Sequence, residues 1–379
     1  MKAYMFYGPG DLRLEDIPVE HPGPGEIAVD IKAAATCGTD LKSYRRGHPT
    51  LFPNLPARFG HEFSGIVSDV GEGVTDFEVG QRVVAANTAP CGHCWACTIG
   101  RESLCENLQY LNGAFAEQIV VPRAIVERNT YIIPDSLAFE AVAPLEPLST
   151  VVHGMHESGI ALGDTVVVNG AGPIGQMYLR LAQLRGATVI VADRSQGRLA
   201  QAEAAGASAV VDLTGLETPE ECAASIRPLT PGGRGADVAI EAVGLPNVWE
   251  QTVLCLRPGG TAVLFGETPK NAPFQVNSSD MHYKEYTLKG VYHHQPRFVQ
   301  IAVELLSSGK FDGMTCAPRS ARWRRSSKAL RTWHAELGRN ISSHRSQGCG
   351  GRVLMRPVIA RQPRHTRRLQ PRGMRVGPR

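Results

Sequence analysis

The chain has 379 residues, with 40 Lys and Arg against 36 Asp and Glu, and a formal net charge of +4. No apolar run approaches the roughly 20 residues that cross a bilayer, and the first residues lack the apolar segment of a secretory signal. These features exclude a membrane protein and predict a cytoplasmic location. The length allows two domains.

Residues 1–150 contain short apolar runs separated by Gly and Pro. Examples are residues 27–32, 65–70 and 81–86. Short runs with frequent turn residues are typical of antiparallel strands. The sequence therefore predicts a β-rich, barrel-like first domain.

Three separated positions in this domain carry metal-binding side chains. Cys37 and His61 lie 24 residues apart, Glu62 follows His61 directly, and Glu146 is isolated in the apolar run 141–148. A carboxylate in apolar surroundings needs a charged partner, because burying it alone is costly. One Cys, one His and one Glu with a position left open match the composition of a catalytic zinc site.

Four cysteines lie close together between these positions, in the predicted lobe 88–108. The spacing is C-x2-C-x2-C-x7-C, formed by Cys91, Cys94, Cys97 and Cys105. Four thiolates surround Zn²⁺ tetrahedrally and leave no position for substrate, so the predicted role is structural. Unligated or disulfide-bonded cysteines and an iron–sulfur cluster remain alternatives. His93 lies within the loop and is expected at the surface.

From residue 163 onward, strands and helices alternate. Apolar strands are predicted at 165–169, 188–192, 208–212, 236–241 and 260–265, and helical spacing at 176–185. This alternation predicts a doubly wound parallel sheet with helices on both faces. A last helix is predicted at 298–307.

A glycine-rich turn follows the first of these strands. Its G-x-G-x-x-G pattern precedes a helix, and Asp193 stands at the end of the next strand, as in dinucleotide-binding folds. Asp193 is expected to accept hydrogen bonds from the adenosine ribose and to repel a 2′-phosphate, which favours NAD over NADP. The alternative is that these glycines only allow the chain to turn and bind no nucleotide. The predicted cofactor residues are Gly170, Gly172, Pro173, Ile174, Gly175, Asp193 and Arg198.

With these motifs placed, residues 1–312 resemble the zinc-containing medium-chain dehydrogenases, the family of alcohol, polyol and threonine dehydrogenases. The stretch Gly60-His-Glu-x2-Gly65-x5-Gly71-x2-Val74 fits the family's zinc signature. The resemblance implies an α/β protein with a GroES-like zinc catalytic domain at 1–150 and a Rossmann NAD-binding domain at 151–290. Residues 291–312 would begin a return to the catalytic domain.

The resemblance also implies roles for individual residues. Cys37, His61, Glu62 and Glu146 would hold the catalytic zinc, and the four cysteines of the lobe a second zinc. Thr39 would relay the alcohol proton, and Asp40 would orient a ligand histidine. Lys42 departs from many relatives, which have a histidine there at the end of the relay.

The implied activity is zinc-assisted hydride transfer from a secondary alcohol, polyol or amino alcohol to NAD⁺. Zinc would lower the pKa of the alcohol so that the alkoxide forms. A homodimer or homotetramer is expected from the family. The alternative is a catalytically impaired relative that still binds zinc and nucleotide, or one with a basic nucleic-acid-binding arm.

The arm is suggested by residues 313–379, which differ from the rest of the chain. They carry 16 Arg and one Lys against one acid, Glu336, a net charge of +16, whereas residues 1–312 carry 23 basic and 35 acidic side chains, a net charge of −12. The ending that relatives use to complete the catalytic domain is not recognisable here. Two interpretations remain open: a frameshifted or disordered ending, or an Arg-rich arm that binds phosphate.

Overall fold

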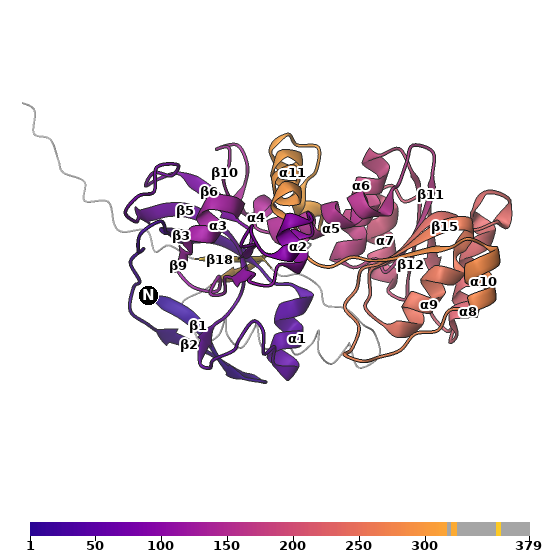
Figure 1. Ribbon diagram of the computed structural model, residues 1–379, viewed down its shortest axis with the longest axis horizontal. Coiled ribbons are helices and arrows are strands. Elements are labelled where there is room, and N and C mark those ends of the chain that lie inside the picture. Colours follow the sequence, from indigo (N-terminus) through magenta and orange to yellow (C-terminus); the bar gives the residue numbers. More distant parts are fainter. Residues whose placement is uncertain (317–319, 324–353, 358–379) are drawn as a thin grey trace, which may run out of the picture.

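The computed structural model describes residues 1–316, 320–323 and 354–357. Two domains lie side by side, and helix α5 (Leu145–Ser158) runs between them (Figure 1). The predicted combination of a β-rich domain and a parallel-sheet domain is confirmed. Within the described ranges, none of the helices combines the length and apolar character that a membrane span requires.

The first domain is built mainly from antiparallel strands around a core of aromatic and branched side chains. Phe6, Phe59, Phe63 and Phe115 are among its fully buried residues. Strands β5, β3 and β9 form the centre of the main sheet, with β6 and β10 beyond β5. Its elements are β1 (Lys2–Gly8), β2 (Asp11–Asp16), β3 (Ile27–Ala35), α1 (Gly38–Arg46), β4 (Ala57–Arg58), β5 (Glu62–Val70), β6 (Arg82–Ala85), β7 (Thr88–Ala89), α2 (Trp95–Thr98), β8 (Gln109–Tyr110), β9 (Gln118–Val121), α3 (Arg123–Asn129), β10 (Thr130–Ile132) and α4 (Phe139–Val142).

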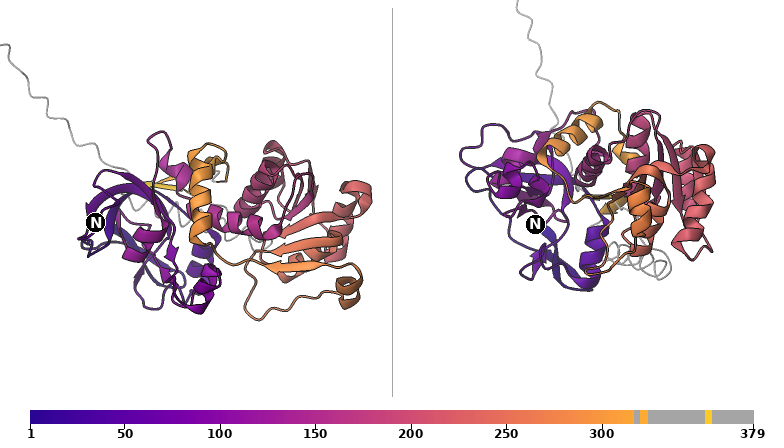
Figure 2. Two further views of the ribbon diagram at one scale, coloured as in Figure 1. Left: turned by 45° about the horizontal axis from the view of Figure 1, so that its top comes forward. Right: turned by 45° about the vertical axis from the view of Figure 1, so that its right-hand side comes forward.

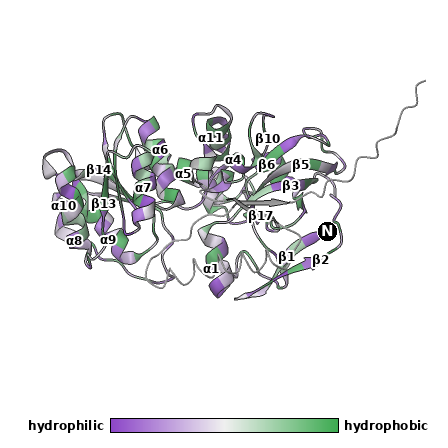
Figure 3. Ribbon diagram, turned by 180° about the vertical axis from the view of Figure 1, so that it is seen from behind, coloured by the Kyte–Doolittle hydropathy of each residue, from purple (hydrophilic) through white to green (hydrophobic). Residues whose placement is uncertain are grey.

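The second domain is a six-stranded parallel sheet with the strand order β13-β12-β11-β14-β15-β16. The order reverses between β11 and β14, which is where doubly wound sheets bind ligands. The strand formed by Thr165–Asn169 is buried along its whole length, because helices cover both faces of the sheet. Figure 3 shows hydrophobic residues along the strands of this domain. The elements are β11 (Thr165–Asn169), α6 (Pro173–Leu184), β12 (Thr188–Asp193), α7 (Gln196–Ala204), β13 (Ala209–Asp212), α8 (Pro219–Ile226), β14 (Ala236–Glu241), α9 (Pro246–Leu254), β15 (Leu256–Leu264), α10 (Ser278–Tyr283) and β16 (Thr287–Gly290).

The sequence located these strands well, except at the start of β15. This strand begins four residues before the predicted 260–265, because it runs through Pro258 and Gly259, which are ordinarily turn residues. Strands β11 and β14 have the predicted bounds.

The two domains share one hydrophobic core where they meet. Helix α11 (Pro296–Ser307) packs against α5, and its Phe298 and Leu306 are buried with Leu148 of α5 and Val84 of β6. Both helices lie between the two sheets in Figure 2. The predicted boundary at 150/151 therefore falls inside a continuous helix, and α11 makes the expected return towards the first domain.

Two short strands of the Arg-rich segment join the first domain. Strand β18 (Leu354–Pro357) pairs antiparallel with Ala34 and Ala35 of β3, and β17 (Ser320–Trp323) pairs with β18. Strand β9 covers the same edge of β3 only from Ile27 to Asp30, so backbone groups beyond it are available for pairing. No strand was predicted here, because pairing uses backbone groups that every residue carries. The predictions of a frameshift, disorder or a basic arm apply to residues 313–379. Apart from residues 313–316 and these two strands, that segment lies outside the described residues.

Candidate functional site

Cys37, Asp40 and His61 form a compact hydrogen-bonded group at the start of α1. Cys37 is the N-cap residue: its Sγ accepts a hydrogen bond from the backbone N–H of Thr39 at 3.2 Å, and its own N–H donates to Asp40 Oδ2 at 2.9 Å. Asp40 Oδ1 lies 3.1 Å from His61 Nδ1. His61 Nε2 in turn faces Cys37 Sγ at 3.3 Å. Asp40 therefore sets the direction of the histidine ring.

Strand register brings Glu62 to the same place. In the antiparallel pair of β3 and β5, Ala35 lies opposite Glu62, so the end of one strand meets the start of the other. The ligand atoms of Cys37, His61 and Glu62 all lie within 4.8 Å of one another, and both His61 and Glu62 are buried. One thiol, one imidazole and one carboxylate fit Zn²⁺ and leave a coordination position open.

Burial and neighbouring charges shift the pKa values of Cys37 and His61. Burial raises the pKa of Cys37 to about 11. Burial lowers the pKa of His61, but Asp40 and Cys37 outweigh it and hold that pKa well above its ordinary value. A dication among the three would favour the thiolate and the neutral imidazole, which are the ligand forms.

Glu146 lies close to two histidines that the sequence analysis did not single out. It stands in the first turn of α5, and its carboxylate is grouped with His293 and His294 rather than with Cys37, His61 and Glu62. Its Oε1 lies 3.7 Å from His293 Nδ1. Ligation of one zinc by Glu146 together with Cys37, His61 and Glu62 stays a prediction.

The sequence analysis missed His293, His294 and Thr88. The Thr88 hydroxyl in β7 lies 2.6 Å from His293 Nε2 and 3.2 Å from His294 Nε2. Burial lowers the pKa of His293 to about 4 and holds the pKa of His294 well below its ordinary value, so both rings are neutral at pH 7. The available signal was the doublet itself, since it is the only pair of adjacent histidines in the sequence.

Lys42, in helix α1, forms an ion pair with a carboxylate of the second domain. Its Nζ lies 2.8 Å from Glu267 Oε2, and Arg46 Nη2 lies 3.5 Å from Glu267 Oε1. Glu267 follows β15 in the second domain, so these ion pairs connect the two domains.

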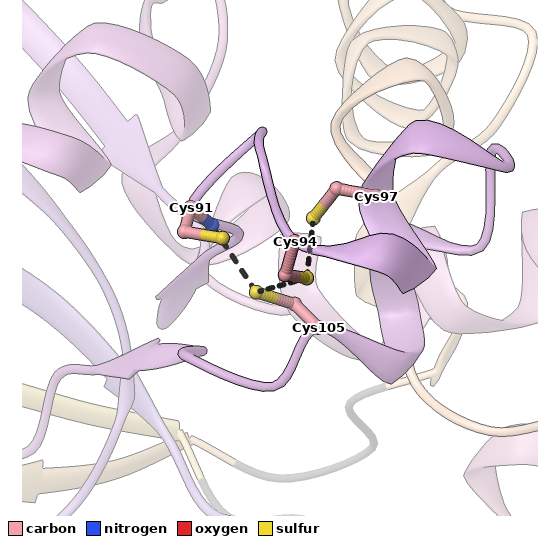
Figure 4. A group of neighbouring side chains, drawn as sticks. All are labelled: Cys91, Cys94, Cys97 and Cys105. Carbon is pink, nitrogen blue, oxygen red and sulfur yellow. Dashed lines mark hydrogen bonds between the residues drawn. The ribbon is translucent and has the colours of Figure 1, made fainter.

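The four cysteines of the lobe point towards a common centre (Figure 4). Cys94 Sγ lies 3.5 Å from Cys97 Sγ and 3.9 Å from Cys105 Sγ. A tetrahedral Zn²⁺ with bonds of about 2.3 Å separates its sulfur ligands by about 3.8 Å, whereas a disulfide needs about 2.05 Å. The backbone N–H of His93 also lowers the pKa of Cys91 to about 6, which favours a thiolate there. His93 itself is exposed, as predicted.

The glycine turn has the geometry of a nucleotide-binding loop. Gly170 has φ 108°, Gly172 caps α6, and Pro173 occupies the first position of the helix. A Cβ atom on Gly175 would lie 1.8 Å from the carbonyl oxygen of Gly170, so the helix can approach the strand only because this position is glycine. The amide groups at the start of α6 are left to bind a phosphate.

Asp193 stands beside this turn at the end of β12. Its carboxylate accepts hydrogen bonds from the N–H groups of Ala171 at 2.7 Å and Ser195 at 2.8 Å, and Arg198 Nη1 lies 4.0 Å away. These contacts place the carboxylate at the wall of a cavity of about 280 Å³, which continues along β12, α8 and α9. The cavity has room for the adenosine half of a dinucleotide.

Replacing Gly175 with alanine is expected to weaken nicotinamide-cofactor binding at least about tenfold, because the added methyl group forces the turn away from the phosphate site. Fluorescence titration of the purified variant with NADH measures this change. Gly197→Ala is the matched control, since a Cβ there meets nothing within 4 Å. Equal affinity in both variants would contradict the assigned role of the turn.

Both domains of the chain match known protein families. The alcohol dehydrogenase GroES-like domain matches residues 23–135, and the zinc-binding dehydrogenase domain matches residues 173–308. Sorbitol dehydrogenase of Bacillus subtilis is 31% identical over 82% of this chain and 87% of its own length. L-Threonine 3-dehydrogenase of Xanthomonas euvesicatoria is 34% identical over 74% of this chain and 80% of its own length.

Solved structures that share this fold have a similar sequence identity to the chain. A protein described as a zinc-binding dehydrogenase from Sinorhizobium meliloti 1021, bound to NADP, superimposes with a TM-score of 0.79. It is 30% identical, and the match covers 94% of this chain and 99% of that one.

Proposed function

Because the chain belongs to the zinc-containing medium-chain alcohol dehydrogenase family, we propose that it oxidises a secondary alcohol, polyol or amino alcohol with NAD⁺ as the hydride acceptor. The observation that carries the proposal is the convergence of Cys37, His61 and Glu62 in one buried group. Sorbitol and threonine, named in the relatives, both carry a secondary hydroxyl group.

In this proposal Cys37, His61 and Glu62 hold the catalytic zinc, which supplies a Lewis acid that lowers the pKa of an alcohol. Asp40 fixes the orientation of His61 through the 3.1 Å contact with its Nδ1. Thr39, whose N–H binds Cys37 Sγ, lies beside the metal ligands, and its hydroxyl group would relay the alcohol proton by accepting it while passing its own proton outward to solvent. The participation of Glu146 as a fourth ligand, which the resemblance implies, remains a prediction.

The preference for NAD⁺ rests on Asp193. A carboxylate at the wall of the adenosine cavity accepts hydrogen bonds from ribose hydroxyls and repels a 2′-phosphate. The NADP bound by the Sinorhizobium relative makes this preference a point to test. Arg194, which also lines the cavity, and Arg198 would partly offset the repulsion.

Replacing Asp193 with asparagine is expected to shift the ratio of kcat/KM for NAD⁺ over NADP⁺ about tenfold or more towards NADP⁺, because it removes the charge and keeps the shape. Initial rates with each cofactor measure the ratio. Glu217→Gln serves as the control, since it removes an exposed acid from the rim of the same cavity. An unchanged ratio in Asp193→Asn would refute the assignment.

The activity itself is tested by following NADH formation across a panel of secondary alcohols, polyols and amino alcohols. Turnover of at least one substrate is expected, with one class clearly preferred. A protein that contains zinc and binds NADH but turns over no alcohol would favour the catalytically impaired relative. A homodimer or homotetramer is proposed from the family, and sedimentation of the purified protein decides between them.

A further inference from the structure

Helix α1 carries residues of the proposed zinc site but contributes little to the apolar core. Cys37 caps this helix, and Thr39 and Asp40 stand in its first turn. The buried residues of α1 are Asp40 and Ser43, which are both polar, and Tyr44 packs against the core of the first domain while only partly buried. Because so little apolar surface holds α1 in place, its position depends largely on polar contacts.

Glu267 of the second domain supplies three contacts of this kind. Its Oε2 accepts a hydrogen bond from Lys42 Nζ at 2.8 Å, and its Oε1 lies 3.5 Å from Arg46 Nη2. Its backbone carbonyl oxygen also lies 3.4 Å from Lys42 Nζ. Lys42 and Arg46 are four residues apart, so they lie on one face of the helix. Burial raises the pKa of Glu267, but Lys42 and Arg46 outweigh burial and lower that pKa below its ordinary value.

The backbone of Glu267 is itself held firmly to the second domain's sheet. Glu241, fully buried at the end of β14, accepts hydrogen bonds from the N–H groups of Gly244 at 2.6 Å and Gly266 at 2.9 Å. A Cβ atom on Gly244 would lie 2.5 Å from the carbonyl oxygen of Glu267, so the turns after β14 and β15 are in close contact. Val243, in the first of these turns, lines the adenosine cavity. Glu267 therefore projects from a rigid part of the cofactor-binding edge.

The contact between the domains differs in character from one end to the other. Figure 1 shows α11 above α5 and α1 below it. Around α5 and α11 the contact is a shared apolar core, whereas at α1 it consists of the ion pairs of Glu267. The Lys42 and Glu267 side chains are 37% and 56% exposed, so salt screens their attraction.

We propose that Glu267 is a positioning residue, which holds α1 at a fixed place relative to the cofactor-binding edge of the second sheet. This inference rests on the proposed function, in which hydride passes from an alcohol beside Cys37 and Thr39 to a cofactor bound on the second domain. Reacting atoms must lie about 3–3.5 Å apart, so a small displacement of α1 slows the transfer strongly. Zinc ligation and binding of the adenosine half of the cofactor do not depend on this alignment.

Stopped-flow measurement of NADH formation in a single turnover tests the role. Glu267→Gln is expected to slow hydride transfer about tenfold, while its zinc content and its affinity for ADP-ribose stay those of the wild type. The double variant Lys42→Met/Glu267→Gln should be no slower than Glu267→Gln, because the pair is already broken. Added NaCl should slow the wild type towards the rate of Glu267→Gln and leave that variant unchanged. Glu203→Gln, which changes an exposed acid of α7, is the matched control.

Hydrogen exchange in α1 tests the same contact without any turnover. Exchange across residues 39–46 should be about tenfold faster in Glu267→Gln than in the wild type and unchanged in Glu203→Gln. Equal exchange in Glu267→Gln and the wild type would overturn the positioning role, as would an unchanged rate of hydride transfer or a loss of zinc in Glu267→Gln. A wild-type protein that turns over no alcohol would instead refute the proposed function, and the exchange result would still report on Glu267.

Discussion

Replacing Cys37 with serine is expected to lower kcat/KM for the preferred alcohol about 1000-fold and to remove one zinc ion per chain. The Cys37 sulfur is the thiolate ligand of the proposed catalytic site and also caps α1. Loss of about 4 kcal/mol of transition-state stabilisation by the Lewis acid corresponds to that factor. Initial rates of NADH formation and zinc analysis of the same preparation measure both effects.

The control is Cys255→Ser, which changes a buried cysteine at the end of α9, in neither cysteine group. This variant should lose some stability but keep its zinc and its turnover. Retained activity in Cys37→Ser, with the zinc still bound, would refute the assigned metal role. A serine hydroxyl still accepts a hydrogen bond from Thr39, so the helix cap should be largely preserved.

Replacing Cys105 with serine is expected to open the cysteine lobe, with amide exchange there about 1000-fold faster than in the wild type. Between residues 91 and 108 only Cys94, Ala96 and Ser103 are buried, while Trp95 remains 70% exposed. The lobe therefore has almost no apolar core, and a bound metal must supply most of its stability. A loss of about 4 kcal/mol in local opening free energy gives this factor.

Hydrogen exchange at the amides of residues 98–101 measures the opening, because these N–H groups donate to carbonyl oxygens within the lobe. Thr98→Ala is the control. Thr98 is an exposed residue of α2, within the lobe, and is not one of the four cysteines. Exchange in Cys105→Ser as slow as in this control would mean that the lobe is stable without its fourth thiolate. Zinc content should fall by one ion per chain in Cys105→Ser alone.

Several sites could be predicted because their residues lie close together along the chain. The four cysteines span 15 residues, and the glycine turn directly joins β11 to α6. In such short segments the backbone can bring ligands together with little help from the rest of the fold. The parallel sheet of the second domain could also be predicted, because strands and helices alternate along this part of the chain.

Other features depend on contacts between residues far apart in the sequence. Glu146 and His293 are separated by 147 positions, and Lys42 and Glu267 by 225. Neither pair has a spacing that any periodicity could reveal. The direction of α5 and the packing of α11 against it decide that Glu146 faces the histidines.

The net charge of +4 shows the same difference between what the sequence determines and what depends on long-range contacts. The sequence by itself determined that an acidic region of −12 precedes a basic one of +16, and it determined the family through motifs that are local. Only the tertiary structure decided that residues 354–357 pair with β3, since any extended backbone can fill the edge that β9 leaves open. Chemistry encoded in neighbouring residues is readable in sequence, whereas chemistry assembled between domains depends on how α5 and α11 pack.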